Sequence, residues 1–221
     1  MGRKTGSYNL FQWLPKDISR KLQRCLRPKY FSAGQVIYCQ GDRGSEMYRV
    51  ASGSVRMVSQ TDEGREVVYL RFVTGDFFGV SSLIDGDTRP HTAEAATPTT
   101  LEVLSKRELD ELRWEHRELD DALLRLMCRM MRYSSGLVSD ISLNSLEKRI
   151  AARVLHECEQ VSTAKDDSMH VNISQSEIAL MTKSSRQTVN KVLRKFQDHG
   201  LLATDYNSIQ ILDMQGLKDL I

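Results

Sequence analysis

The stretch of sequence that decides the fold of the C-terminal part spans residues 178–193 and reads IALMTKSSRQTVNKVL. Apolar residues recur at helical spacing up to Met181 and again from Val189, and the polar run between them predicts a tight turn. Ser174 and Glu177 stand at capping-box spacing just ahead of the first apolar run. The stretch therefore predicts two short helices around a turn.

The second predicted helix has one apolar face and one basic face. Its start is marked by Ser184 and Ser185, and its apolar positions are Val189, Val192, Leu193 and Phe196. Between Lys183 and Lys195 the chain carries five basic residues and no acidic one. Such a surface suits an acidic polymer, and the alternative is a helical hairpin with a solvated basic face.

The residues after this pair of helices favour the first interpretation. Gly200 is expected to end the second helix, and residues 201–204 and 209–212 predict two short strands around a turn that contains Asn207. Two helices followed by a β-wing form a winged helix-turn-helix, which reads DNA.

The whole chain has the composition of a globular protein with room for two modest domains. It has 221 residues, 40% of them hydrophobic and 27% charged, and a net charge of +2. The four cysteines are scattered and lack the spacing of a zinc or iron-sulfur site. No apolar run approaches the ~20 residues of a membrane span. The N-terminus lacks the apolar core of a signal peptide, so we expect a cytoplasmic protein without a membrane partner.

The N-terminal half predicts a β-barrel or sandwich preceded by a helix. That helix is expected to start at Pro15 and to stop at Pro28. Eight of the thirteen glycines lie between Gly34 and Gly86, which is the rhythm of short strands and turns. The candidate strands are 36–39, 47–51, 55–59, 67–72 and 101–104. Only His91 among the five histidines falls within this barrel, which argues against a metal-dependent barrel enzyme.

A long helical pattern follows Lys106. One apolar row repeats at nearly heptad spacing and consists of Leu119, Leu123, Leu126, Met130, Tyr133, Leu137 and Ile141. A second flank contains Leu124, Met127 and Met131. One flank can lie on the barrel while the other meets a partner, so we expect a homodimer with the first row as its seam. The alternative is a wholly intramolecular core helix.

The predicted boundary between the two halves lies near Asn144. Asn144 and Glu147 again have capping-box spacing, and a helix is expected from about residue 146 to 160. A polar loop at residues 162–168 and a short strand at 171–173 should lead into the helix-turn-helix. We therefore expect a barrel domain at 1–115, a dimerisation helix and hinge at 116–143, and a DNA-binding domain at 144–221.

In this order of elements the chain resembles the superfamily of the cyclic-AMP receptor protein and the fumarate-nitrate regulator (CRP/FNR), which are bacterial transcription factors. The stretches that carry the resemblance are 41–48, 52–55 and 75–79 in the barrel and 185–189 in the second helix of the motif. The resemblance implies an α+β protein with an N-terminal β-roll or jelly-roll sensor barrel, a long dimerisation helix and a C-terminal winged helix-turn-helix. It also implies a homodimer, with RNA polymerase as a partner.

Family members that bind cyclic nucleotide hold the ribose with a Glu and the cyclic phosphate with an Arg. Here Val80 occupies the Glu position, and His91 occupies the Arg position, with Arg89 two residues earlier. Two serines of the long helix lie where members contact the base. The residues of the possible effector pocket are Val80, Arg89, His91, Thr92, Ser134 and Ser135. We expect no cyclic-AMP binding and no haem or iron-sulfur cofactor. The alternative is a cyclic-AMP-responsive regulator in which Arg89 replaces the missing Arg.

By family position, Arg186, Gln187 and Lys191 are expected to read base edges. Arg can pair with guanine, Gln with adenine, and Lys with guanine or a phosphate. The residues expected to hold the DNA backbone are Ser174, Ser176, Thr188, Arg194 and Lys195. A homodimer would present two such helices about one DNA turn apart, so the operator should be an inverted repeat. The rival interpretation is a barrel enzyme or regulatory subunit whose C-terminal domain binds other proteins.

Overall fold

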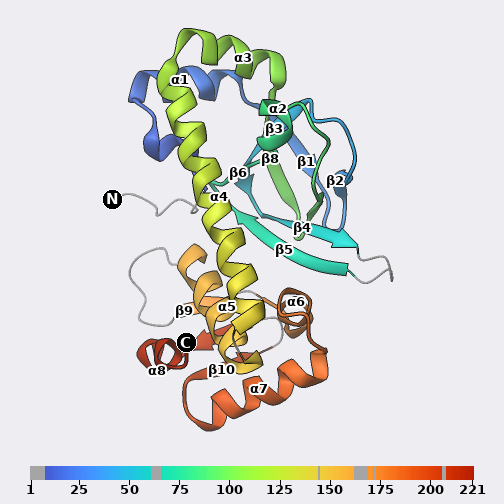
Figure 1. Cartoon of the computed structure of the whole chain (residues 1–221), viewed down its shortest axis with the longest axis vertical. Helices are drawn as coiled ribbons and strands as arrows, with labels where there is room; N and C mark the ends of the chain where they lie inside the picture. The colour runs from blue at the N-terminus through green and yellow to red at the C-terminus, as the bar shows by residue number, and fades with distance from the viewer. Residues whose placement is uncertain (1–7, 61–65, 144, 162–168, 172, 206–207) are drawn as a thin grey trace. The chain divides into compact units, whose positions relative to one another are not determined.

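The computed structural model describes the backbone of residues 8–60, 66–143, 145–161, 169–171, 173–205 and 208–221 (Figure 1). Side chains are described for these residues except 60, 66, 67, 69, 136–143, 159–161 and 169. Contacts divide the chain into two compact units, one of residues 5–60 and 69–133, the other of residues 1–4, 61–68 and 134–221. The first unit contains the barrel core and the second contains the helix-turn-helix.

The barrel is built on two four-stranded sheets, and every strand expected from the glycine rhythm is present. The first sheet has the order β1-β8-β3-β6, with bounds Arg27–Phe31, Thr99–Ser105, Glu46–Ser52 and Phe77–Phe78. The second has the order β2-β7-β4-β5, with bounds Val36–Tyr38, Thr92–Ala95, Ser54–Gln60 and Glu66–Val73. The expected all-β sensor fold is therefore confirmed.

Three strands, β1, β6 and β7, were not expected from the sequence. Pro28 lies inside β1, where it pairs with Glu102 of β8, instead of directly ending the preceding helix. That helix, α1 (Lys16–Cys25), ends earlier. Because β1 is an edge strand, it tolerates a residue that lacks a backbone N–H. β6 and β7 are too short for the pattern to show.

The helical run after Lys106 is two helices, not one. α3 (Lys106–Glu115) starts with a capping box formed by Ser105 and Glu108. His116 ends it in an extended conformation, and α4 (Arg117–Leu143) follows directly. A short helix, α2 (Ser81–Ile84), and a single 3-10 turn, η1 (Leu10–Trp13), complete the described helices of the N-terminal half.

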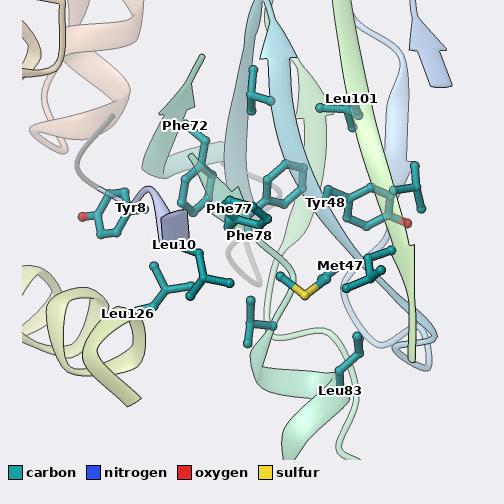
Figure 2. Packing of buried hydrophobic residues seen from close by; sticks show 14 of the residues in the cluster. Tyr8, Leu10, Met47, Tyr48, Phe72, Phe77, Phe78, Leu83, Leu101 and Leu126 are labelled. Atoms are coloured by element: carbon teal, nitrogen blue, oxygen red, sulfur yellow. The ribbon is translucent and has the colours of Figure 1, made fainter. Parts of the chain in front are cut away.

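An aromatic cluster forms the barrel core (Figure 2). The ring of Phe78 stacks at a centroid distance of 5.1 Å on Tyr48 and 5.2 Å on Phe72. Leu126 reaches the same core from α4 and points towards Leu10 of the N-terminal segment. The core therefore joins both sheets, the N-terminal segment and the first half of α4.

The second unit has the order of elements expected for a winged helix-turn-helix. Its helices are α5 (Leu146–Val161), α6 (Gln175–Met181), α7 (Arg186–Asp198) and α8 (Met214–Asp219). Its sheet has the order β10-β11-β9, with bounds Leu202–Asp205, Ser208–Ile211 and Met169–Val171. The hairpin β10–β11 is the expected wing. β9 starts two residues earlier than expected, and α8 was not expected. The predicted loop at 162–168 lies outside the described residues.

Candidate nucleic-acid interface

The first helix of the motif is held by its cap and by its apolar face. Ser174 Oγ accepts a hydrogen bond from Glu177 N at 3.1 Å, and the Glu177 carboxylate accepts one from Ser174 N at 2.8 Å. Ile178 and Met181 are buried. The Ser174 hydroxyl is therefore engaged within the chain, whereas Ser176, the other serine expected to hold the DNA backbone, is exposed.

The turn between the helices contains the one non-glycine residue with positive φ among the described residues. Lys183 has a φ of 51°, in the left-handed region. The chain closes around it with a hydrogen bond of 2.9 Å from Ser184 N to Ala179 O. The turn therefore keeps a tight geometry with a lysine in a conformation that favours glycine.

The second helix, α7, places its side chains as the pattern predicts. Ser185 caps it by accepting from Thr188 N at 3.1 Å. Its apolar positions Val189, Val192, Leu193 and Phe196 are buried. Arg186, Gln187, Lys191 and Arg194 are exposed. The exposed face thus offers two guanidinium groups, one ammonium and one amide.

Two further residues expected to hold the DNA backbone, Thr188 and Lys195, also have partners inside the protein. Lys195 Nζ donates to both carboxylate oxygens of Glu147, at 2.9 and 3.0 Å. The hydroxyl of Thr188 lies 2.7 Å from Ser185 Oγ. Glu147 lies in the first turn of α5, so the ion pair joins α7 to α5.

A further contact, which the sequence did not indicate, links the two helices of the motif. Asn190 Nδ2 donates to Gln175 Oε1 at 2.9 Å. Asn190 follows Gln187 by three residues and therefore lies near the exposed row of α7. This hydrogen bond joins α7 to α6 close to the exposed polar residues of α7.

Three residues of the expected dimer seam on α4 lie in the barrel core. Leu119, Leu123 and Leu126 are buried at 0 to 2% exposure in the barrel core of a single chain. They are therefore unavailable to a partner in this structure. Apolar residues repeat at heptad spacing whether a helix packs within its own chain or against a partner chain. The spacing alone therefore could not show which of the two surfaces this row contacts.

The remaining positions of the expected seam fall into two groups. Met130 and Tyr133 are partly buried and pack against the barrel core as well. The side chains of Leu137 and Ile141 lie outside the described residues. The exposed apolar residues of α4 belong to the second flank, where Leu124 is 65% and Met131 is 62% exposed.

The sensor residues of the barrel are more enclosed than the sequence indicated. Val80 precedes α2 and is 1% exposed. Arg89 is 3% exposed and donates to Gly79 O at 2.6 Å and to Glu46 O. Its guanidinium carbon lies 4.3 Å from the centroid of the Tyr38 ring. Arg89 thus points into the barrel, where its charge faces an aromatic ring and two carbonyl oxygens.

His91 and Thr92 make hydrogen-bond contacts within the barrel unit. His91 Nδ1 lies 2.8 Å from Ser59 Oγ, and burial lowers the pKa of His91, which favours the neutral ring. Thr92 Oγ1 accepts from Gln40 N at 2.9 Å. The two serines of α4, Ser134 and Ser135, belong to the unit that carries the helix-turn-helix. In the barrel unit, Arg89 and His91 lie in the segment between α2 and β7, and Thr92 is the first residue of β7.

The described residues contain neither a metal-binding cluster nor a helix suited to span a membrane. No group of three or more His, Cys, Asp or Glu side chains there could hold a metal ion. Within the same ranges, no helix is both long and apolar enough to cross a membrane.

Comparison with known proteins identifies both halves of the chain. Residues 28–116 match the cyclic nucleotide-binding domain, and residues 148–220 match the Crp-like helix-turn-helix domain. The transcriptional regulator LdrP of Thermus thermophilus is 31% identical over 191 residues, which cover 86% of this chain and 94% of that protein. The chain belongs to the CRP/FNR family of transcription regulators.

Other CRP/FNR proteins agree in length and fold. The CRP-like cAMP-activated global transcriptional regulator of Mycobacterium tuberculosis is 28% identical over 213 residues, 94% of each chain. The structure of FixK2 from Bradyrhizobium japonicum superposes with a TM-score of 0.81 at 19% identity, over 88% of this chain and 96% of that one. As a CRP/FNR protein, the chain is a transcription regulator with a sensor domain and a DNA-binding domain, and it is not an enzyme.

Proposed function

We propose that this CRP/FNR protein binds an inverted-repeat operator as a homodimer, with α7 of each protomer in the major groove of one half-site. The observation that carries the proposal is the exposed row of α7, where Arg186, Gln187 and Lys191 are exposed while the apolar face is buried. Recognition helices place exposed polar residues of this kind against base edges. The regulator class itself is given by the family.

The base contacts follow from the chemistry of these three side chains. The guanidinium of Arg186 can donate two parallel hydrogen bonds to guanine, and the amide of Gln187 can pair with adenine. Lys191 can reach a guanine acceptor or a phosphate. Ser176 and Arg194 are the exposed candidates for backbone contacts, which set the position on DNA without reading the sequence.

The geometry of the operator provides the test. A site selected from a random library should contain two copies of one half-site in inverted orientation, with centres about one helical turn apart. We expect tight binding to that duplex and weak binding to a duplex in which one half-site is reversed to form a direct repeat. Equal affinity for the inverted and the direct repeat would contradict the symmetric dimer.

We assign the dimer face to the exposed flank of α4. Leu124, Cys128 and Met131 are exposed and follow one another in steps of four and three, as residues of a coiled-coil seam do. A partner α4 would cover the two large apolar side chains of this flank, Leu124 and Met131. Leu124→Asp should therefore produce monomers in sedimentation. Tyr30→Asp, which changes a residue of equal exposure (64%) on the edge strand β1, should leave the dimer intact.

Cys128 supplies a second, direct test of this face. Cys39 is also exposed, so the experiment uses a Cys39→Ser background. A short bismaleimide should then link two protomers through Cys128, and Cys128→Ser in the same background should abolish the link. A dimer in sedimentation that resists cross-linking at Cys128 would place the interface elsewhere.

The sensor pocket is proposed not to bind cyclic AMP. Val80 offers no acceptor for a ribose hydroxyl, and Arg89 already donates to two backbone carbonyls. No haem or iron-sulfur cofactor is proposed, and RNA polymerase is proposed as a partner on family resemblance alone.

One observation favours a second candidate, in which Arg89 binds an anionic nucleotide. Arg89 is buried and forms no ion pair within the described part of the chain, and its Nε atom has no hydrogen-bond partner there. A buried cation without a carboxylate partner is suited to an anion. Calorimetry with cyclic AMP on the wild type and on Arg89→Lys distinguishes a pocket that binds no cyclic AMP from one in which Arg89 binds the nucleotide. Binding by the wild type that Arg89→Lys abolishes would favour the second candidate over the first.

A further inference from the structure

One basic residue of the recognition helix is neutralised inside the protein. Among the exposed cations of α7, Lys195 alone forms an ion pair within the described residues, whereas Arg186, Lys191 and Arg194 form none there. Its partner is Glu147, whose two carboxylate oxygens lie 2.9 and 3.0 Å from Lys195 Nζ. The two residues are 48 positions apart, so the pair depends on the fold of this unit.

The pair has little to contribute to stability. The side chains of Lys195 and Glu147 are 54% and 42% exposed, and solvent screens an exposed ion pair of this kind strongly. At the start of α5, Ser145 Oγ accepts a hydrogen bond from Lys148 N at 3.4 Å. The expected partner in a capping box, Asn144, lies outside the described residues.

Lys195 nevertheless lies where a DNA phosphate would be expected. It follows Lys191 by four residues, which places it one helical turn further along and about 40° around the helix axis. It is therefore at the edge of the row that is proposed to enter the major groove. A phosphate beside this row would compete with the Glu147 carboxylate for the same ammonium group.

We infer that Glu147 withholds Lys195 from the DNA backbone and so sets the strength of sequence-independent binding. A phosphate contact strengthens binding to every sequence equally, whereas base contacts strengthen binding only to the operator. By neutralising one phosphate-binding cation, Glu147 lowers affinity for DNA of any sequence and leaves the base contacts of α7 unchanged. This inference rests on the proposed placement of α7 on DNA.

The test measures the salt dependence of binding to a random-sequence duplex. Each phosphate contact adds about 0.9 to the slope of log affinity against log salt. Glu147→Gln should steepen the slope by about 0.9, so its affinity should fall about 3.5-fold more than that of the wild type between 50 and 200 mM salt. Lys195→Ala alone should leave the slope unchanged. The double variant Glu147→Gln, Lys195→Ala should return to the wild-type slope.

Two controls separate this effect from general electrostatics and from misfolding. Asp219→Asn removes the same charge from the same unit. The Asp219 carboxylate accepts a hydrogen bond from Gln215, a neutral side chain, so the slope should not change. Circular dichroism of each variant should match that of the wild type. A variant that fails this check is replaced by Glu147→Ala, for which the same slope is expected.

Three results would overturn the inference. They are an unchanged slope for Glu147→Gln, an equal change for Asp219→Asn, and a double variant that keeps the steeper slope. If the wild type bound neither the operator nor the random duplex, this result would contradict the proposed DNA-binding function. It would also contradict the inference about Glu147, which rests on that function. Wild-type binding with an unchanged slope for Glu147→Gln would contradict the inference alone.

Discussion

Replacing Lys183 with glycine should stabilise the turn of the helix-turn-helix. Lys183 has a φ of 51°, and the left-handed region costs an L-residue roughly 1–2 kcal/mol. Glycine has no such cost, but its greater freedom in the unfolded chain offsets about 0.4–1 kcal/mol. The net gain for Lys183→Gly should be about 0.5–1 kcal/mol. Lys183→Ala keeps the strained conformation and should show no comparable gain.

The alanine variant is a matched control because both substitutions remove the same charge. Any loss of DNA affinity that results from the missing ammonium group should therefore be equal in the two variants. The difference that remains between them reports the backbone strain alone.

Hydrogen exchange in the full chain measures this gain locally. Both tryptophans, Trp13 and Trp114, lie in the barrel unit, so tryptophan fluorescence would not report on the helix-turn-helix. A gain of about 0.5–1 kcal/mol should slow the exchange of amides in α6 and α7 about 2- to 5-fold relative to Lys183→Ala. Equal or faster exchange in Lys183→Gly would refute the assignment of strain to this turn.

Three further predictions concern the barrel and the motif. Leu126→Ala should destabilise the barrel by about 2–5 kcal/mol in tryptophan-monitored urea unfolding, because Leu126 is fully buried; a loss below 1 kcal/mol would contradict its place in the core. Burial raises the pKa of Asp76 to about 7, so its contribution to stability is present below pH 4 and lost as the pH rises through 7. The free energy of unfolding should therefore fall from pH 5 to pH 8 in the wild type more than in Asp76→Asn, and equal falls would contradict this. Ser174→Ala should cost about 1 kcal/mol of stability in α6, measured by hydrogen exchange, and unchanged exchange would show that its cap is dispensable.

Local signals in the sequence predicted the DNA-binding half well. The capping box of Ser174 and Glu177 and the apolar spacing of α7 depend on residues within one or two turns of each other, and both are present. The order of barrel, long helix and winged motif was predicted for the same reason. Elements too short to show a clear periodic pattern, such as β6, β7 and α8, were not predicted.

The features that the sequence could not predict depend on contacts between distant residues. Whether Leu126 faces the barrel or a partner cannot be read from spacing, because both environments favour leucine at heptad positions. The pairing of Glu147 with Lys195 requires the fold that brings α5 beside α7. Similarly, the hydrogen bonds from Arg89 to the carbonyls of Gly79 and Glu46 depend on backbone atoms whose positions the side-chain pattern does not specify.

The affinity of Arg186→Ala for matched and scrambled duplexes tests the central claim most directly. Arg186 is exposed at the first position of α7 and is proposed to pair with guanine. Removing it should cost roughly 1–3 kcal/mol on the selected operator, relax selectivity at one base pair of each half-site, and leave the scrambled duplex much less affected. Equal losses on the operator and on the scrambled duplex would contradict a base-reading role for this helix.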